Sequence, residues 1–281
     1  MFASKTEKMH NNDDYISPQG FLNFHIHSQE NYCLFLDIDG TISEFHVDPN
    51  KSYIDKNVLN NIQELIDVNI PVVAVTGRTI QDASRLFYPI NLPIAGTHGL
   101  EIQINPNEII QRPKHQTNFE QLYIELVEAC LDYPKLTIEK KKHSIALHFR
   151  KYPNLQDIAY QIISSFLESY PELHISRGKC VYELILRDAN KGKAIQKIYD
   201  YLKLHHYIPI FLGDDVTDEF GFDAINHLNG ISIKIGEGKT NAQYRLRNVT
   251  QAKDFIGLFT NFSINKKYTS EQTQTVFSLT N

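Results

Sequence analysis

The stretch that decides the fold is Tyr-Cys-Leu-Phe-Leu-Asp-Ile-Asp-Gly-Thr, residues 32–41. Its first five residues are apolar, and they stop abruptly at two aspartates that are separated by one residue and followed by glycine. A short, wholly apolar run is typical of a strand buried on both faces of a parallel sheet. An acidic turn directly after such a strand predicts a ligand site at the carboxyl edge of that sheet.

Further runs of the same kind alternate with segments whose apolar residues recur at helical spacing, such as 59–66. This alternation is typical of a parallel sheet with helices on both faces. We therefore expect an α/β fold with a doubly wound parallel sheet. The runs expected to form its strands are 32–36, 71–75, 92–96, 208–212 and 230–235.

The middle of the chain breaks this alternation and predicts a separate unit. We expect an inserted α+β domain, a cap, at residues 112–186, between the two halves of the sheet. The elements expected in it, in αββαββ order, are a helix at 119–130, strands at 135–139 and 144–149, a helix at 155–170, and strands at 173–176 and 180–186.

The remaining segments complete the expected domain organisation. Residues 29–111 and 187–262 should form the core. Residues 1–28 are polar and have no sustained period, so we expect a loosely ordered N-terminal arm. Residues 263–281 look similar, and we expect a polar C-terminal tail.

Composition limits the classes of partner. The formal net charge of −5 argues against a large basic surface for nucleic acid. No apolar run approaches the roughly 18–20 residues that a membrane span needs. The three cysteines, Cys33, Cys130 and Cys180, are too far apart to suggest a metal site, and we read them as reduced thiols. We therefore expect a cytoplasmic monomer without nucleic-acid or membrane partners.

Four short polar motifs lie, in sequence order, at the ends of predicted strands or the starts of predicted helices. Each alone is commonly a turn or a helix cap, but their joint occurrence is specific. Acids concentrated in two strand-end loops repel each other and need a cation, and all-oxygen ligands favour Mg²⁺. Such a cluster with a lysine, a threonine and free amides is typical of phosphoryl transfer. The four motifs are Asp37–Thr41, Thr76–Arg78, Lys191–Lys193 and Gly213–Glu219.

Asp37–Thr41, Thr76, Lys191 and Gly213–Asp215 together resemble the haloacid dehalogenase superfamily of phosphatases. That superfamily has the doubly wound fold expected above. The resemblance implies that Asp37 attacks phosphorus and becomes an aspartyl phosphate. It also implies that Asp39 protonates the leaving alkoxide and then takes a proton from the hydrolytic water.

The same resemblance implies the metal and phosphate contacts. Mg²⁺ would be held by the carboxylates of Asp37 and Asp214 and by the backbone carbonyl of Asp39. Asp215 and Asp218 would orient metal-bound waters. Thr76, the Gly77 amide and Lys191 would neutralise charge on the transferring phosphoryl group. Arg78 is also expected to bind the substrate.

Longer stretches, spread over about residues 31–262, resemble the trehalose-6-phosphate phosphatase family, in its free-standing bacterial form. They include Leu92–Gly99 with Glu101, Ala146–Arg150, Gly178–Glu183 and Phe211–Glu219. The resemblance implies hydrolysis of trehalose 6-phosphate to trehalose and inorganic phosphate, with Arg150, Lys179 and Glu183 of the cap binding the sugar. It places His98 near the seam between core and cap.

Alternative readings remain at this point. The substrate could be another sugar phosphate, such as sucrose phosphate or a glycosyl phosphoglycerate. A signalling receiver module shares the acidic cluster but lacks an acid two residues after its acceptor, and has no cap. A catalytically inactive sugar sensor is disfavoured, because every reactive group is present. Arg150 could be a mere strand residue and His98 a turn residue, and we read Lys140–Lys142 as a solvated turn.

Overall fold

The computed structural model describes residues 15–46, 51–178 and 180–278. Eight strands form the larger sheet, in the order β12-β11-β10-β1-β2-β3-β4-β5, and all adjacent pairs from β12 to β3 are parallel. The α/β fold is therefore confirmed. The strands are β1 (Tyr32–Leu36), β2 (Val72–Val75), β3 (Ile94–Gly96), β4 (Glu101–Asn105), β5 (Glu108–Gln111), β10 (Ile208–Gly213), β11 (Ile231–Ile235) and β12 (Tyr244–Leu246).

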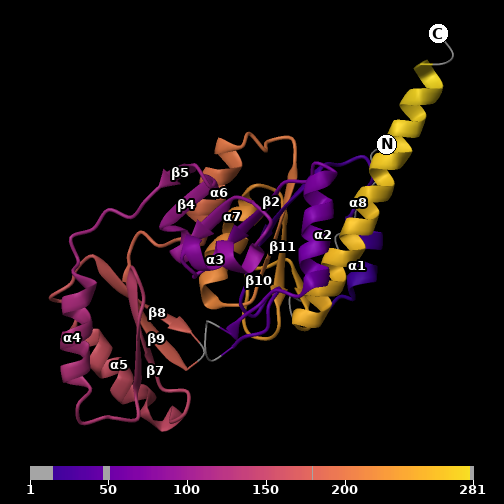
Figure 1. The fold of residues 1–281 in the computed structure, drawn as a ribbon. Coiled ribbons are helices and arrows are strands. Elements are labelled where there is room, and N and C mark those ends of the chain that lie inside the picture. Colours follow the sequence, from indigo (N-terminus) through magenta and orange to yellow (C-terminus); the bar gives the residue numbers. More distant parts are fainter. Residues whose placement is uncertain (1–14, 47–50, 179, 279–281) are drawn as a thin grey trace, which may run out of the picture.

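Helices cover both faces of this sheet because its strands are apolar on both sides (Figure 1). In β1, Leu34 and Leu36 pack on one face while Cys33 and Phe35 pack on the other. The first face is covered by α1 (Pro18–His25), α2 (Lys56–Asp67), α3 (Ile80–Phe87) and α8 (Val249–Ser278). The second face is covered by α6 (Lys191–Tyr201) and α7 (Glu219–His227).

The strand order reverses between β1 and β10, and this reversal positions the site. From β1 the chain proceeds through β2 to β3 in one direction, whereas β10, β11 and β12 extend in the other. Leu36 pairs with Leu212, so the two strands end side by side. Ligands of open α/β sheets bind beyond the carboxyl ends at such a reversal.

A second, antiparallel sheet forms from strands in the order β6-β7-β9-β8. Two helices pack on it around a core of their own that includes Leu122, Leu126 and Ile163. All these elements lie within residues 112–186, the expected insert, and extend away from the larger sheet (Figure 1). They are α4 (Phe119–Ala129), β6 (Thr137–Lys140), β7 (Ser144–His148), α5 (Gln156–Ser165), β8 (Leu173–Gly178) and β9 (Val181–Leu186).

The hairpin of β4 and β5 was not expected, and it makes the larger sheet mixed rather than wholly parallel. Both strands run antiparallel to their neighbours at the edge of the sheet. Several side chains of the hairpin are partly exposed. It therefore lacks the continuous apolar run that marks the interior strands.

The expectation of a loosely ordered arm over 1–28 is wrong for its last part. Ser17 caps α1 by accepting a hydrogen bond from the amide of Gly20 at 3.1 Å. Phe21 and Leu22 are buried against the sheet. The apolar residues of this short helix are too few to show a period, so packing rather than pattern defines it. The earlier part of the arm, residues 1–14, lies outside the described residues.

The expectation of an irregular tail from 263 is also wrong, because α8 continues to Ser278. Its first half packs on the sheet through Phe255 and Phe259, and its later turns extend beyond the body of the molecule (Figure 1). Adding a turn to an existing helix is much easier than starting one, so a polar sequence can continue it. Among the described residues no helix is long and apolar enough to cross a membrane.

Candidate active site

The ends of β1 and β10 bring two acidic turns into contact. The Asp37 amide donates a hydrogen bond to the Leu212 carbonyl at 3.0 Å, which places Asp37 beside the start of the second turn. Gly40 has a φ of +83°, and a Cβ there would lie 2.1 Å from Asp214 Oδ2. Only glycine therefore permits this approach of Asp214 to the first turn.

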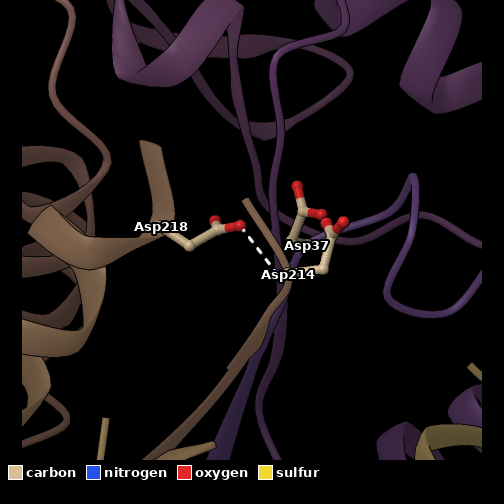
Figure 2. A group of neighbouring side chains, drawn as sticks. All are labelled: Asp37, Asp214 and Asp218. Atoms are coloured by element: carbon tan, nitrogen blue, oxygen red, sulfur yellow. Dashed lines mark hydrogen bonds between the residues drawn. The ribbon is translucent and has the colours of Figure 1, made fainter. Parts of the chain in front are cut away.

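Three carboxylates converge at this point. Oxygens of Asp37, Asp214 and Asp218 lie within 4.8 Å of one another. Figure 2 shows Asp37 and Asp214 against each other, with Asp218, the residue directly before α7, pointing toward them. The Thr41 hydroxyl lies 3.0 Å from Asp37 Oδ2 and 3.4 Å from Asp214 Oδ1, so it links two of the three.

Lys191 joins this group from the first position of α6. Asn190 caps that helix by accepting from the Lys193 amide at 2.9 Å, which fixes where the helix begins. The Lys191 ammonium donates to Asp37 Oδ1 at 2.7 Å and to Asp218 Oδ1 at 2.6 Å. The lysine is only 2% exposed. Burial opposes its charge, but the adjacent Asp218 and Asp37 raise its pKa above the ordinary value.

Burial dominates the electrostatics of the acids. It raises the pKa of Asp37 to about 7, with Lys191 opposing the rise. It raises the pKa of Asp214 to about 9, with Asp37 and Asp218 adding to the rise. One ammonium is therefore not enough to keep all the carboxylates ionised at neutral pH. A further cation would do so, and an all-oxygen donor set fits a hard divalent ion.

Asp218, expected to orient metal-bound waters, lies within the carboxylate cluster. Its carboxylate is fully buried, and both of its oxygens accept hydrogen bonds from the protein. Oδ1 accepts from Lys191, and Oδ2 accepts from the amides of Asp214 at 3.0 Å and Asp215 at 2.9 Å. Asp218 thus fixes the turn after β10. The Asp215 side chain caps the short helical segment that follows.

Arg78, expected to contact substrate, holds Asp39 in this structure. Its Nε donates to Asp39 Oδ2 at 2.6 Å and its Nη2 to Asp39 Oδ1 at 2.7 Å. The same Nη2 donates to Ser52 Oγ at 2.7 Å. A guanidinium that grips both oxygens of a carboxylate fixes its direction. Thr76 is buried beside this pair, and its hydroxyl accepts from the Arg78 amide at 3.1 Å.

His98 lies against the Thr76–Gly77 turn. It has a φ of 54°, in the left-handed region, and a Cβ on Gly77 would lie 2.6 Å from its ring. Burial lowers the pKa of His98 to about 4, so the imidazole is neutral at physiological pH. Among the described residues its buried Nδ1 has no hydrogen-bond partner. Backbone strain with an unsatisfied polar atom is typical of a functional position.

On the side of the smaller sheet, Glu183 of β9 accepts from Ser144 Oγ at 2.5 Å and from Lys141 Nζ at 2.9 Å. Burial opposes the charge of Glu183, but Lys141 outweighs it and the pKa falls to about 2. The interpretation of Lys140–Lys142 as a solvated turn holds for Lys140 and Lys142, whose side chains are 36% and 58% exposed, but not for Lys141, which pairs with the buried Glu183. Lys142 pairs with Glu101 of the larger sheet at 2.5 Å. Each of the three lysines has its own carboxylate partner.

Two further contacts cross between the sheets. The guanidinium of Arg150 lies over the ring of Phe45, 4.4 Å from its centroid. A Cβ on Gly178, the last residue of β8, would lie 4.0 Å from Asp215 Oδ2. The smaller sheet thus approaches the acidic turns. Lys179, expected to bind the sugar, lies outside the described residues.

The sequence model of the trehalose-phosphatase family matches residues 35–250. The chain belongs to the trehalose-phosphatase family. Trehalose-6-phosphate phosphatase of Escherichia coli is 32% identical over 82% of this chain and 86% of its own length. A probable trehalose-phosphate phosphatase of Sinorhizobium fredii is 34% identical over 74% of this chain and 78% of its own length.

Solved structures agree on the fold of this trehalose-phosphatase family member. A trehalose-6-phosphate phosphatase related protein superimposes with a TM-score of 0.65 at 26% identity, over 83% of this chain and 99% of its own. The C-terminal domain of the C. albicans trehalose-6-phosphate phosphatase gives a TM-score of 0.74 at 18% identity, over 89% and 98% of the two chains. The chain is thus a phosphatase by family, and its three converging carboxylates form a group that can hold a metal ion.

Sequence reasoning missed several residues of this phosphatase site. Ser52 carried no signal, and Lys141 was interpreted as part of a solvated turn, because only the folded chain brings them to Asp39 and Glu183. Lys234 did carry one, as a charged residue inside the apolar strand Ile231–Ile235. A lysine in such a strand needs a buried partner, and its partner proves to be the Asp214 carbonyl.

Proposed function

We propose that this chain hydrolyses trehalose 6-phosphate to trehalose and inorganic phosphate through an aspartyl phosphate on Asp37. The observation that carries the proposal is the contact of Asp37 with Lys191 beside Asp214, at the reversal of the strand order. Family membership supports the substrate.

In the first step an oxygen of Asp37 attacks phosphorus, and the bond to the sugar oxygen breaks. Asp39 donates a proton to the departing alkoxide. Lys191 and the Gly77 amide stabilise negative charge on the phosphoryl oxygens. Thr76 supports the turn that carries this amide.

In the second step water attacks the phosphorus of the aspartyl phosphate, Asp39 takes its proton, and the Asp37 carboxylate is restored. Arg78 and Ser52 fix the direction of the Asp39 carboxylate during this cycle. We assign Mg²⁺ as the divalent ion, because the available donors are carboxylate and carbonyl oxygens. Asp37 and Asp214 would hold it with the Asp39 carbonyl, and when bound it neutralises charge on the phosphoryl group.

The smaller sheet would act as the cap that selects the sugar. Glu183 and Lys141 offer a hydrogen-bond acceptor and donor from it, and His98 offers an unsatisfied nitrogen from the larger sheet. Arg150 and Lys179 would add donors at its edge. Residues 112–186 are the proposed cap, and 29–111 with 187–262 the proposed core. The further expectation, a cytoplasmic monomer acting on a small molecule, is testable by sedimentation and fractionation.

Phosphate release from a panel of sugar phosphates tests the proposal. The panel contains trehalose 6-phosphate, sucrose phosphate, a glycosyl phosphoglycerate and glucose 6-phosphate, each with Mg²⁺ and with EDTA. We expect the highest kcat/KM for trehalose 6-phosphate and no turnover with EDTA. A higher kcat/KM for another sugar phosphate would overturn the substrate, and full activity in EDTA would overturn the metal.

A further inference from the structure

Lys234 is a buried charge that the proposed reaction does not use. It lies within β11, is 4% exposed, and pairs in register with Gly213 at the end of β10. A lysine is rarely buried unless its ammonium is paired, since transfer of a charge out of water is unfavourable. Its position beside the acidic turn therefore calls for a role.

The Lys234 ammonium donates to the backbone carbonyl of Asp214. The amide of Asp215 belongs to the same peptide group, and it donates to Asp218 Oδ2 at 2.9 Å. This peptide group is therefore held at both ends, its oxygen by Lys234 and its N–H by Asp218. Rotation of the peptide, which would turn the Asp214 side chain, has to break both hydrogen bonds.

The contacts continue from this peptide to Asp37. Asp218 uses its other oxygen to accept from Lys191, and Lys191 also donates to Asp37. A line of polar contacts thus connects Lys234 with both carboxylates that face the proposed metal position. The hydrogen bond of Lys234 is to the backbone carbonyl of Asp214 and not to its carboxylate, so Lys234 can act on the orientation of this ligand through the peptide group.

We propose that Lys234 is a positioning residue that fixes the Asp214–Asp215 peptide and thereby aims the Asp214 carboxylate at the divalent ion. The inference rests on the proposed metal site. Loss of groups that orient metal ligands typically weakens metal affinity about 10–100-fold. If the backbone of Asp214 is no longer held, we expect the affinity for Mg²⁺ to fall by a factor in this range.

Mg²⁺ binding by calorimetry, without substrate, tests this role in the full chain. Lys234→Met keeps the length of the side chain and removes the donor and the charge. We expect its Mg²⁺ Kd to rise about 10–100-fold, while kcat at saturating Mg²⁺ falls by a smaller factor. Lys234→Gln, which keeps a polar end, is measured in the same way in case the methionine variant does not fold.

Arg245 provides a matched control. Arg245 lies on β12, where it pairs in register with Lys234 of β11, and its side chain is equally buried. Its guanidinium donates to the carbonyls of Gly236 and Gly238 rather than to Asp214. Arg245→Met should lower the melting temperature and leave the Mg²⁺ Kd of the folded protein unchanged.

The outcomes separate the two proposals. A folded Lys234 variant with a Mg²⁺ Kd within about threefold of the wild type, well short of the loss expected for such a group, overturns the role of Lys234. So does a failure of both Lys234 variants to fold, since the residue would then be purely structural. An equal loss of affinity in Arg245→Met also overturns it. A wild-type protein that binds no Mg²⁺ overturns the metal site itself, and the role of Lys234 with it.

Discussion

At the scale of single residues, the Arg78–Asp39 contact changes how the site is understood. Arg78 follows the Thr76–Gly77 turn, and from sequence it was expected to contact substrate. In the structure two of its nitrogens bind both oxygens of Asp39, at 2.6 and 2.7 Å, and Ser52 supports it. This geometry favours a residue that orients the general acid–base over one that binds the phosphoryl group.

The two roles of Arg78 predict different kinetics. In Arg78→Gln we expect kcat/KM for trehalose 6-phosphate to fall about 10²-fold, the lower end of what general acid–base catalysis contributes. The loss for an aryl phosphate should be much smaller, since a good leaving group needs no proton. Ser52→Ala should show the same pattern more weakly. An equal loss on both substrates would instead place Arg78 on the phosphoryl group.

His98 predicts a pH dependence of stability. Burial lowers its pKa to about 4, whereas an unfolded imidazole titrates near 6.5. As the pH falls, the unfolded chain therefore binds this proton first, and stability is lost progressively from about pH 6.5 down to about pH 4. Melting temperatures of the wild type and His98→Gln at pH 7.5 and 5.0 check this. Between these two pH values the melting temperature should fall more for the wild type than for the variant. An equal fall in both proteins would contradict the pKa assigned to His98.

At the scale of elements, buried and patterned segments could be predicted from sequence and edge segments could not. β1, β2 and β10 are continuous apolar runs because helices cover both their faces, and β11 departs from this pattern only at Ser232 and Lys234. The β4–β5 hairpin is partly exposed, and α1 contributes few apolar residues, so neither has a clear period. Such segments are defined by what they pack against, which a single sequence does not show.

The C-terminal helix illustrates this difference within one element. Phe259 is buried and its ring packs edge-on against Tyr32, whereas Tyr268 on the same helix is 61% exposed. Phe259→Ala should lower the free energy of unfolding by about 3–5 kcal/mol. Tyr268→Ala should change it by no more than about 0.5 kcal/mol. Denaturant unfolding of both variants checks this, and similar values would show that α8 does not dock as described.

At the scale of the whole molecule, the site lies between two separately packed sheets. Asp37 and Asp214 were predictable because the carboxyl ends of neighbouring parallel strands meet at one edge, and Lys191 because it begins a predicted helix. Lys141 was not, because its pairing with Glu183 depends on how two strands of the smaller sheet align. The sequence thus predicts the chemistry better than the substrate contacts.

Glu183 tests whether the smaller sheet selects the sugar. If Glu183 binds the sugar, Glu183→Ala removes a hydrogen bond between a sugar hydroxyl and a charged group. Such a bond is worth about 1.5–3 kcal/mol. We expect kcat/KM for trehalose 6-phosphate to fall about 10–150-fold, and that for a small aryl phosphate much less. Glu139→Ala, which removes a carboxylate bonded to His148 in the same sheet, is the control. Equal losses on both substrates, with a lower melting temperature, would make Glu183 a structural residue only.

The measurement that tests the central claim most directly is the capture of the phosphorylated enzyme. The protein is mixed with trehalose 6-phosphate and Mg²⁺, quenched in acid within one turnover, digested, and analysed by mass spectrometry. We predict one phosphoryl group on the peptide that contains Asp37, and none in folded Asp37→Asn, which should also release no phosphate. Phosphate release by Asp37→Asn, or a phosphoryl group on another residue, would contradict the account.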